Sequence, residues 1–199
     1  MARPKKFDEQ EVLNAITLLF WQRGYTATSM KDIENATQMT ASSLYNHFGN
    51  KEALFATVLN FYFENVIQIR IHTYLNRSGD PLKNLRDFFL SSVDKNVPKE
   101  LQGHACLLVN TIAEWGPELS DLTSNLQKFD GVLKLALQKN IQSAQNQGLI
   151  RTDKSVDELT NYLKISMHGL LVESKLNFSP THLQTIVTTI FDHITTINK

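Results

Sequence analysis

The sequence predicts an all-α protein. Hydrophobic residues recur at three- and four-residue steps along most of the 199-residue chain, which is the spacing of one face of a helix. There are no long alternating runs of apolar and polar residues, and no Asn-Gly or Asp-Gly turn joins two such runs. Glycine, proline and capping residues divide the helical pattern into nine segments.

Three helices are expected in the first 50 residues, at 8–23, 29–36 and 40–47. Asp8 is a candidate N-cap for the first helix, and Gly24 is a candidate C-cap. Ser29 and Asp32 have the spacing of a capping box, so the second helix is expected to begin there. A three-residue turn then separates the second helix from the third, which Gly49 ends.

Six further helices are expected at 51–75, 81–93, 104–114, 117–147, 154–175 and 180–197. Pro81, Pro117 and Pro180 suit the first turn of a helix, where the missing amide hydrogen has no acceptor to lose. Gly148 ends the longest helix. The change from short to long helices predicts a domain boundary near residue 50, and therefore domains at 1–50 and 51–199.

The composition is that of an ordinary globular protein. Hydrophobic residues make up 42% of the chain and charged residues 20%, and the formal net charge is zero. No apolar run reaches the length of a membrane span, which is about 18 residues. The single cysteine forms neither an internal disulfide nor, alone, a zinc site. We therefore expect a cytoplasmic protein with no metal, no cofactor and no membrane contact. Residues 1–6 form a short basic arm.

The second and third helices have the organisation of a helix-turn-helix. In such a motif the second of the two short helices enters the major groove of DNA, which is wide enough for one helix. The residues whose small or polar side chains suit base edges are Thr40, Ala41, Ser42, Asn46 and His47. Tyr45 and Lys51 carry a hydroxyl and an ammonium of the kind that binds phosphate. The alternative is a three-helix bundle with no role in DNA binding.

At these residues the sequence resembles the TetR family of regulators. The matching segments are 24–33, which looks like the entry to the second helix, and 43–48 with 51–54, which look like the recognition helix and the start of the fourth. The resemblance implies that Thr28, Tyr45 and Lys51 contact phosphates and that positions 40–42, 46 and 47 face bases. It also implies a helix-turn-helix domain at 1–50, and a regulatory, ligand-sensing and dimerisation domain at 51–199. The family usually has Ala-Gly in the turn, where this chain has Thr37-Gln38.

The last two helices, at 154–175 and 180–197, each carry an apolar stripe. In the last helix it consists of Leu183, Ile186, Val187, Ile190, Phe191, Ile194 and Ile197. In the preceding helix it consists of Leu159, Tyr162, Leu163, Ser166, Met167, Leu170 and Leu171. A terminal helix has few chain neighbours left to cover such a stripe, so a two-fold partner is expected, with burial inside the same chain as the alternative. The TetR resemblance favours a homodimer, which suits palindromic double-stranded operator DNA.

The central helices, about 52–150, are rich in aromatic residues, and a cavity for a small-molecule inducer between them is expected. The segment from Gly103 to Val109 is similar to a TetR subgroup that includes repressors sensing electrophiles and oxidants. In those proteins a cysteine is paired with a lysine, so the resemblance implies a sensor built from Cys106 and Lys175. The alternative is that Cys106 is a small buried hydrophobic residue.

An enzyme is the rival from another class. The sequence contains no Gly-rich phosphate loop, no metal-ligand spacing and no nucleophile elbow, so we expect no catalytic residues. His104 and Cys106 are two residues apart on the expected helix and point away from each other. The sequence therefore predicts a repressor released from DNA by a small-molecule, electrophile or oxidant inducer. An activator of the same fold and a Cys-dependent enzyme are the alternatives.

Overall fold

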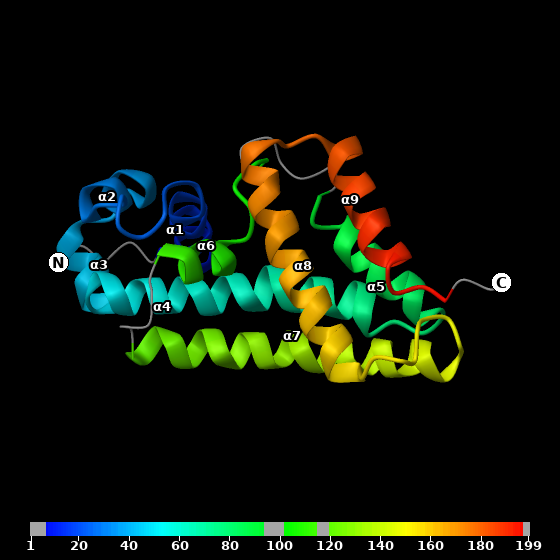
Figure 1. Ribbon diagram of the computed structural model, residues 1–199. Helices are drawn as coiled ribbons and strands as arrows, with labels where there is room; N and C mark the ends of the chain where they lie inside the picture. Colours follow the sequence, from blue (N-terminus) through cyan, green and yellow to red (C-terminus); the bar gives the residue numbers. More distant parts are fainter. Residues whose placement is uncertain (1–6, 94–101, 115–119, 197–199) are drawn as a thin grey trace.

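The computed structural model describes residues 7–93, 102–114 and 120–196, and within these ranges the chain forms nine α-helices and no strand (Figure 1). The helical elements are α1 (Glu9–Arg23), α2 (Met30–Thr37), α3 (Ala41–Phe48), α4 (Lys51–Tyr62), η1 (Phe63–Gln68), η2 (Ile71–Leu75), α5 (Pro81–Leu90), α6 (Leu107–Glu114), α7 (Ser120–Asn146), α8 (Val156–Leu176) and α9 (Pro180–Asp192). The predicted all-α class is confirmed. Among these helices none is both long and apolar enough to cross a membrane.

Local side-chain caps begin the first two helices where the sequence predicts them. Asp8 accepts hydrogen bonds from the amides of Gln10 and Glu11 at 2.9 and 3.3 Å. Ser29 and Asp32 form the reciprocal capping box, each accepting the other's amide hydrogen. These bonds satisfy amides that have no partner inside the helix.

The predicted helix at 51–75 is present, but its winding changes along its length. After α4 the chain continues through two π-helical segments, η1 and η2, with Ile69 and Arg70 between them in right-handed helical conformation. Figure 1 shows this long helix lying beside α7, with α8 crossing over both, α9 next to α5, and α1–α3 at one end. We call α1–α3 the head.

A single hydrophobic core runs from the head into the rest of the chain through α4. Phe55 of α4 contacts Phe20 of α1, with the ring centroids 4.7 Å apart. Further along, Phe63 stacks on Phe129 of α7 at 4.1 Å. Burial of each large side chain contributes about 1.5–3 kcal/mol, so α4 joins the head firmly to the remaining helices.

Some helix ends differ from the prediction. The sixth helix begins at Leu107 instead of residue 104, because Ala105 has φ 56°, a left-handed conformation that a continuous helix excludes. The ninth ends at Asp192, where the chain turns so that the Ile194 carbonyl accepts the amide of Arg151. The basic arm at 1–6, Pro117 and Ile197 lie outside the described residues.

Candidate functional site

The turn between α2 and α3 holds the two short helices in a fixed arrangement. Gln38, where the family usually has glycine, adopts the left-handed conformation, with φ 57° and ψ 20°. The Glu34 carboxylate of α2 accepts the amide of Ala41 at 2.6 Å, and Thr40 accepts the amide of Ser43 at 3.3 Å. The first of these bonds lowers the pKa of Glu34. Sequence analysis missed Glu34, because the bond depends on how the two helices pack.

The third helix is anchored on one face and free on the other. Leu44 and Phe48, four residues apart, are buried in the head. Thr40, Ser42, Tyr45, Asn46 and His47 are exposed, and Ala41 is partly exposed. Tyr45 has 45% of its surface accessible. The predicted base-facing residues therefore lie on an accessible helix, although His47 also lies 3.5 Å from the Glu9 carboxylate.

Thr28 and Lys51 make contacts within the protein. Thr28 has no accessible surface, and its hydroxyl donates to the Gly24 carbonyl at 2.6 Å. The Lys51 ammonium donates to the Tyr25 carbonyl at 2.7 Å and lies 4.1 Å from the centre of the Tyr25 ring. Burial lowers the pKa of Lys51 and is only partly opposed by the charge of Glu114. Both residues brace the loop between α1 and α2, and their phosphate contacts stay predictions.

Helix α6 is fastened to the head at both of its ends. At its start the Trp21 indole N–H donates to the Ala105 carbonyl at 2.9 Å. At its end the Glu114 carboxylate accepts the amides of Tyr25 and Thr26 at 3.0 and 2.7 Å, and we call this contact the Glu114 latch. Gly24 is needed there, because it has φ 79° and a Cβ on it would lie 2.8 Å from Glu114 Oε2.

The charge of Glu114 strengthens the latch. Burial raises the pKa of Glu114, but the bonds from Thr26 and Tyr25 and the nearby Lys51 outweigh that effect and leave it below the ordinary value. A carboxyl with a depressed folded-state pKa stabilises the protein fully above its unfolded pKa, about 4.3 for Glu. The contribution is lost as the pH falls through the folded-state pKa.

The Glu114→Gln variant is expected to loosen this contact. Its neutral amide accepts more weakly, and a hydrogen bond to a charged group contributes about 1.5 kcal/mol or more. The amides of Tyr25 and Thr26 should then exchange with solvent deuterium roughly tenfold faster. Glu64→Gln, at an exposed residue bonded to Gln68, is the matched control. Unchanged exchange in Glu114→Gln would show that the latch does not hold the head.

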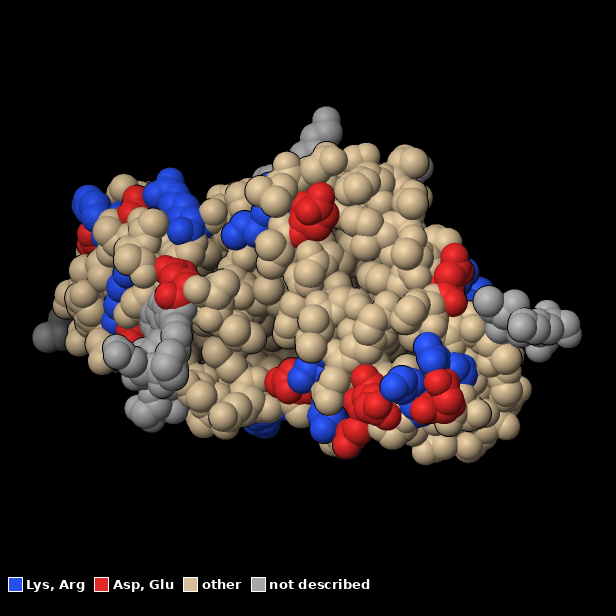
Figure 2. Space-filling view, viewed as in Figure 1, with Lys and Arg blue, Asp and Glu red and all other residues tan. Residues whose placement is uncertain are grey.

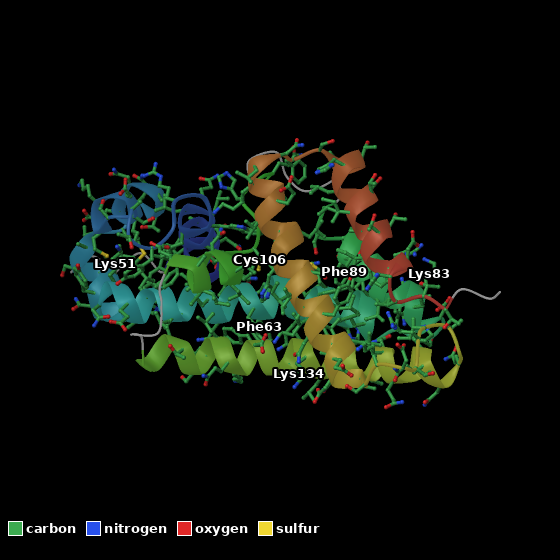
Figure 3. The ribbon with its side chains drawn as sticks, viewed as in Figure 1. Lys51, Phe63, Lys83, Phe89, Cys106 and Lys134 are labelled. Atoms are coloured by element: carbon green, nitrogen blue, oxygen red, sulfur yellow. The ribbon has the colours of Figure 1, made fainter. Side chains whose placement is uncertain are left out.

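Two neighbouring cavities lie against Cys106 in the middle of the molecule (Figure 3). The larger, of about 150 Å³, is also lined by Trp21, Tyr62 and Arg70. The smaller, of about 70 Å³, is lined mainly by apolar side chains from η1, α5, α6, α7 and α8. Cys106 is buried, and its sulfur accepts the Tyr62 hydroxyl at 3.4 Å. Figure 3 shows Cys106 well separated from Lys51, which begins α4 next to the head.

Lys175 has a different partner from the one expected. Its side chain is exposed, and the ammonium donates to Asn110 at 3.1 Å. The cation that lines both Cys106 cavities is Arg70, which sequence analysis missed. Lys175 was inferred from its sequence position, which is comparable with that of the lysine in the similar proteins. The burial of Arg70, in contrast, depends on how the helices pack. The pairing of Cys106 with Lys175 therefore gains no support from this geometry.

The apolar stripes expected to face a partner lie mostly inside this chain. Leu183, Val187, Ile190 and Phe191 are all buried, and Phe191 meets Phe89 of α5 edge to face at 5.1 Å. The buried residues of the α8 stripe are Leu159, Leu163, Met167, Leu170 and Leu171. The prediction that these side chains are left uncovered by their own chain and face a partner is therefore wrong, because α5 and α7 cover them.

Another face of α8 is exposed and apolar. It consists of Ile165, Gly169, Val172 and Leu176, spaced four, three and four residues apart, and we call it the α8 seam. The accessible fractions of Ile165, Val172 and Leu176 are 71%, 48% and 81%. Figure 2 shows few charged side chains over the upper part of α8 and most of α9.

Two family models match the chain. One, described as bacterial regulatory proteins of the tetR family, matches residues 12–58, and one described as a tetracyclin repressor-like C-terminal domain matches residues 81–190. Among curated relatives, the HTH-type transcriptional repressor DhaR of Mycobacterium sp. strain GP1 is 30% identical over 92% of this chain and 90% of its own length. The repressor ComR of Escherichia coli K12 is 28% identical over 94% and 89%.

Solved structures share the fold. A cysteine mutant of the TetR family regulator CifR, complexed with 26 bp double-strand operator DNA, superposes with a TM-score of 0.83 at 23% identity, covering 96% of this chain and 98% of that one. The reduced form of NemR from E. coli gives a TM-score of 0.78 at 17% identity, covering 96% and 98%.

Proposed function

Because the chain belongs to the TetR family of bacterial DNA-binding transcription regulators, we propose that it is a repressor of the sequence-specific, inducer-released kind. A homodimer binds palindromic double-stranded operator DNA, and an inducer releases it. Residues 1–50 are the DNA-binding domain, and 51–199 are the regulatory and dimerisation domain. The observation that carries the proposal is the accessible face of α3, held by a helix-turn-helix whose turn and caps are complete. The relatives named above are repressors, not enzymes.

Recognition in this proposal is divided between the two sides of α3. Asn46 and the small residues at the start of the helix read base edges, while the Tyr45 hydroxyl holds a phosphate. Lys51 and Thr28 support the head from within, and Lys51 adds positive charge close to the backbone of the DNA. Because the net charge of the chain is zero, affinity depends on where these groups lie.

The test is selection of binding sites from a random double-stranded DNA library with the purified full chain. The expected product is an inverted repeat whose half-site centres lie about one helical turn apart. A library that shows no enrichment, or enrichment without two-fold symmetry, would contradict the proposal. Transcript levels of a reporter placed behind the selected site separate repression from activation.

The dimer in this proposal forms through α8 and α9, with the α8 seam at its centre. Gly169 supports this arrangement, since a Cβ there would meet nothing within 4 Å among the described atoms of its own chain. Glycine inside a helix lowers helix stability by about 1 kcal/mol relative to alanine. Close packing of the partner's helix against Gly169 would account for a glycine at this position. The outer face of α9 contributes Thr181, Thr185, Thr188 and Thr189.

The inducer site in this proposal is the cavity region around Cys106. The thiol lines both cavities, so a small electrophile that enters them meets the sulfur. Arg70 lines both cavities with Cys106, and the Tyr62 hydroxyl donates to the sulfur. A modified Cys106 displaces Ala105, whose carbonyl holds Trp21 of the head, and so changes how α6 positions the head.

The Cys106→Ser variant is expected to bind operator normally and to ignore N-ethylmaleimide, which should weaken operator binding by the wild type about 100-fold. Such a loss needs roughly 2.7 kcal/mol of differential affinity. The thiolate sulfur adds to the ring double bond, and the neighbouring carbon takes a proton from water. Operator binding is measured by fluorescence anisotropy before and after treatment. If N-ethylmaleimide releases the variant and the wild type from operator equally, Cys106 is only a core residue and not the sensor.

A further inference from the structure

The two cavities beside Cys106 meet at Arg70, which lines both. Arg70 lies between the π segments η1 and η2, and its side chain is partly accessible although it points into the protein. Such π segments are frequent at functional sites. The guanidinium therefore lies where a bound molecule would meet it.

The groups that hold Arg70 are neutral. Its Nε and Nη2 donate to Ser91 Oγ at 3.2 and 3.1 Å, and Nη2 also donates to the Phe88 carbonyl at 3.1 Å and to Ser92. The guanidinium also lies 4.8 Å from the centre of the Phe88 ring. Among the described residues no carboxylate comes within 4.0 Å of it.

An arginine with no carboxylate partner among the described residues is costly in such a place. Burial lowers the pKa of Arg70, against the opposing effects of Tyr62 and Cys106. An arginine nevertheless keeps its charge in proteins, so the desolvation cost is borne by the folded state. An anion entering the cavity would offset that cost.

The lining of the larger cavity combines polar and apolar groups. Arg70 is joined there by the hydroxyls of Ser91, Ser92 and Tyr62, and burial raises the pKa of Tyr62 well above its ordinary value, so its hydroxyl stays neutral. The apolar part of the lining includes Trp21, Val66, Ala105, Leu171 and Phe178. This distribution fits a molecule with a negative head and a short hydrocarbon body.

We propose that the larger cavity binds a small monocarboxylic acid, with its carboxylate on the Arg70 guanidinium and its hydrocarbon between Trp21, Leu171 and Phe178. The class follows from charge and from the donor that is left: Nε and Nη2 already donate to described residues, whereas Nη1 has no acceptor among them and can donate a charge-assisted hydrogen bond to a carboxylate oxygen. The size follows from the volume of about 150 Å³, since a cavity of about that size holds benzene. This inference rests on the proposed function, to which it adds a non-covalent inducer of stated chemical class beside the electrophiles that react at Cys106.

The smaller cavity is a poorer site for an anion. Its carboxylate, Asp130, is held by Lys164 at 2.5 Å, and burial lowers the pKa of its histidine, His168, with Lys164 adding to that effect. An acid there would face Asp130 and a neutral imidazole. The smaller cavity therefore takes only an extension of the hydrocarbon, through the lining that both cavities share.

The position of the acid explains how it would act on DNA binding. Trp21 belongs to α1 of the head and lines the larger cavity, and its indole N–H holds the Ala105 carbonyl. A hydrocarbon body pressed against Trp21 changes the contact that fastens α6 to the head. Operator release then needs no covalent change at Cys106.

The test compares acids with their uncharged amides by calorimetry on the full-length protein without DNA. Butyrate and hexanoate are paired with butyramide and hexanamide, and inorganic phosphate serves as an anion without a hydrocarbon body. The acids are expected to bind at least about 30-fold more tightly than the amides, as expected for a desolvated charge pair. Amides that bind as tightly as acids, or acids that fail to bind at millimolar concentration, would overturn the proposal.

Variants then locate the site. Arg70→Gln should lose the preference for acid over amide, whereas Arg151→Gln, at a surface arginine paired with Asp153, should keep it. Arg70→Gln that retains the preference would also overturn the proposal. If that variant does not fold, the acid-to-amide ratio of the wild type decides alone.

Operator binding is measured separately by anisotropy, without acid, for each folded variant. Acid binding without operator binding would contradict the proposed function and leave the cavity assignment standing. Operator binding without acid binding would overturn the cavity assignment and leave the proposed function standing.

Discussion

Replacing Tyr45 and Asn46 together by alanine is expected to weaken operator binding by about 100-fold or more, because one phosphate contact and one base contact are lost and each base contact contributes about 1–3 kcal/mol. Both side chains are exposed on α3 and neither is part of the head core, so the fold should be unaffected. The loss is measured by fluorescence anisotropy on the selected operator, with thermal unfolding as the check on folding.

The single variants separate the two roles. Tyr45→Ala should weaken binding to every DNA sequence and reduce its dependence on salt, whereas Asn46→Ala should change the preferred base pair. Gln10→Ala, at an exposed position on α1, is the matched control and should bind as the wild type does. A double variant that binds operator as tightly as the wild type would show that α3 is not the reading helix.

Replacing Val172 by glutamate is expected to convert the protein into a monomer. The side chain lies in the middle of the α8 seam and is 48% exposed in one chain, so the carboxylate is tolerated by the monomer and desolvated only in the dimer. Operator binding should fall by about 100-fold or more, because two linked heads gain that much over one. Sedimentation velocity reports the mass, and anisotropy reports the binding.

Leu135→Glu is the matched control for this variant. Leu135 is an exposed leucine on α7, with 68% of its surface accessible, and it lies outside the α8 seam. It should sediment as the wild type does. Ile190 is unsuitable for the same test, because it is buried within its own chain and a charge there would unfold the monomer. A Val172→Glu protein that remains dimeric would place the interface elsewhere.

Local signals in the sequence predicted the head well. The caps at Asp8 and Ser29 and the end of the third helix at Gly49 all depend on residues within a few positions of one another. Interactions between residues close in the chain can be predicted from the sequence alone. The exposed face of α3 followed directly from them.

Contacts between distant residues could not be predicted in the same way. Glu114 reaches amides 88 and 89 positions earlier in the chain, and Trp21 bonds to a carbonyl 84 positions later. The stripe on α9 is apolar because α5 covers it, and an amphipathic pattern does not say which surface will do so. Arg70 carries no sequence signal, since a charged residue on a helix is ordinarily solvated.

The most direct test of the account is the affinity of the wild-type protein for the selected palindrome compared with a scrambled duplex of the same composition, at two salt concentrations. The account predicts that two protomers bind one palindrome, at least about 1,000-fold more tightly than the scrambled duplex. It also predicts that the affinity for both duplexes falls as salt rises. Equal affinity for the palindrome and the scrambled duplex would contradict it.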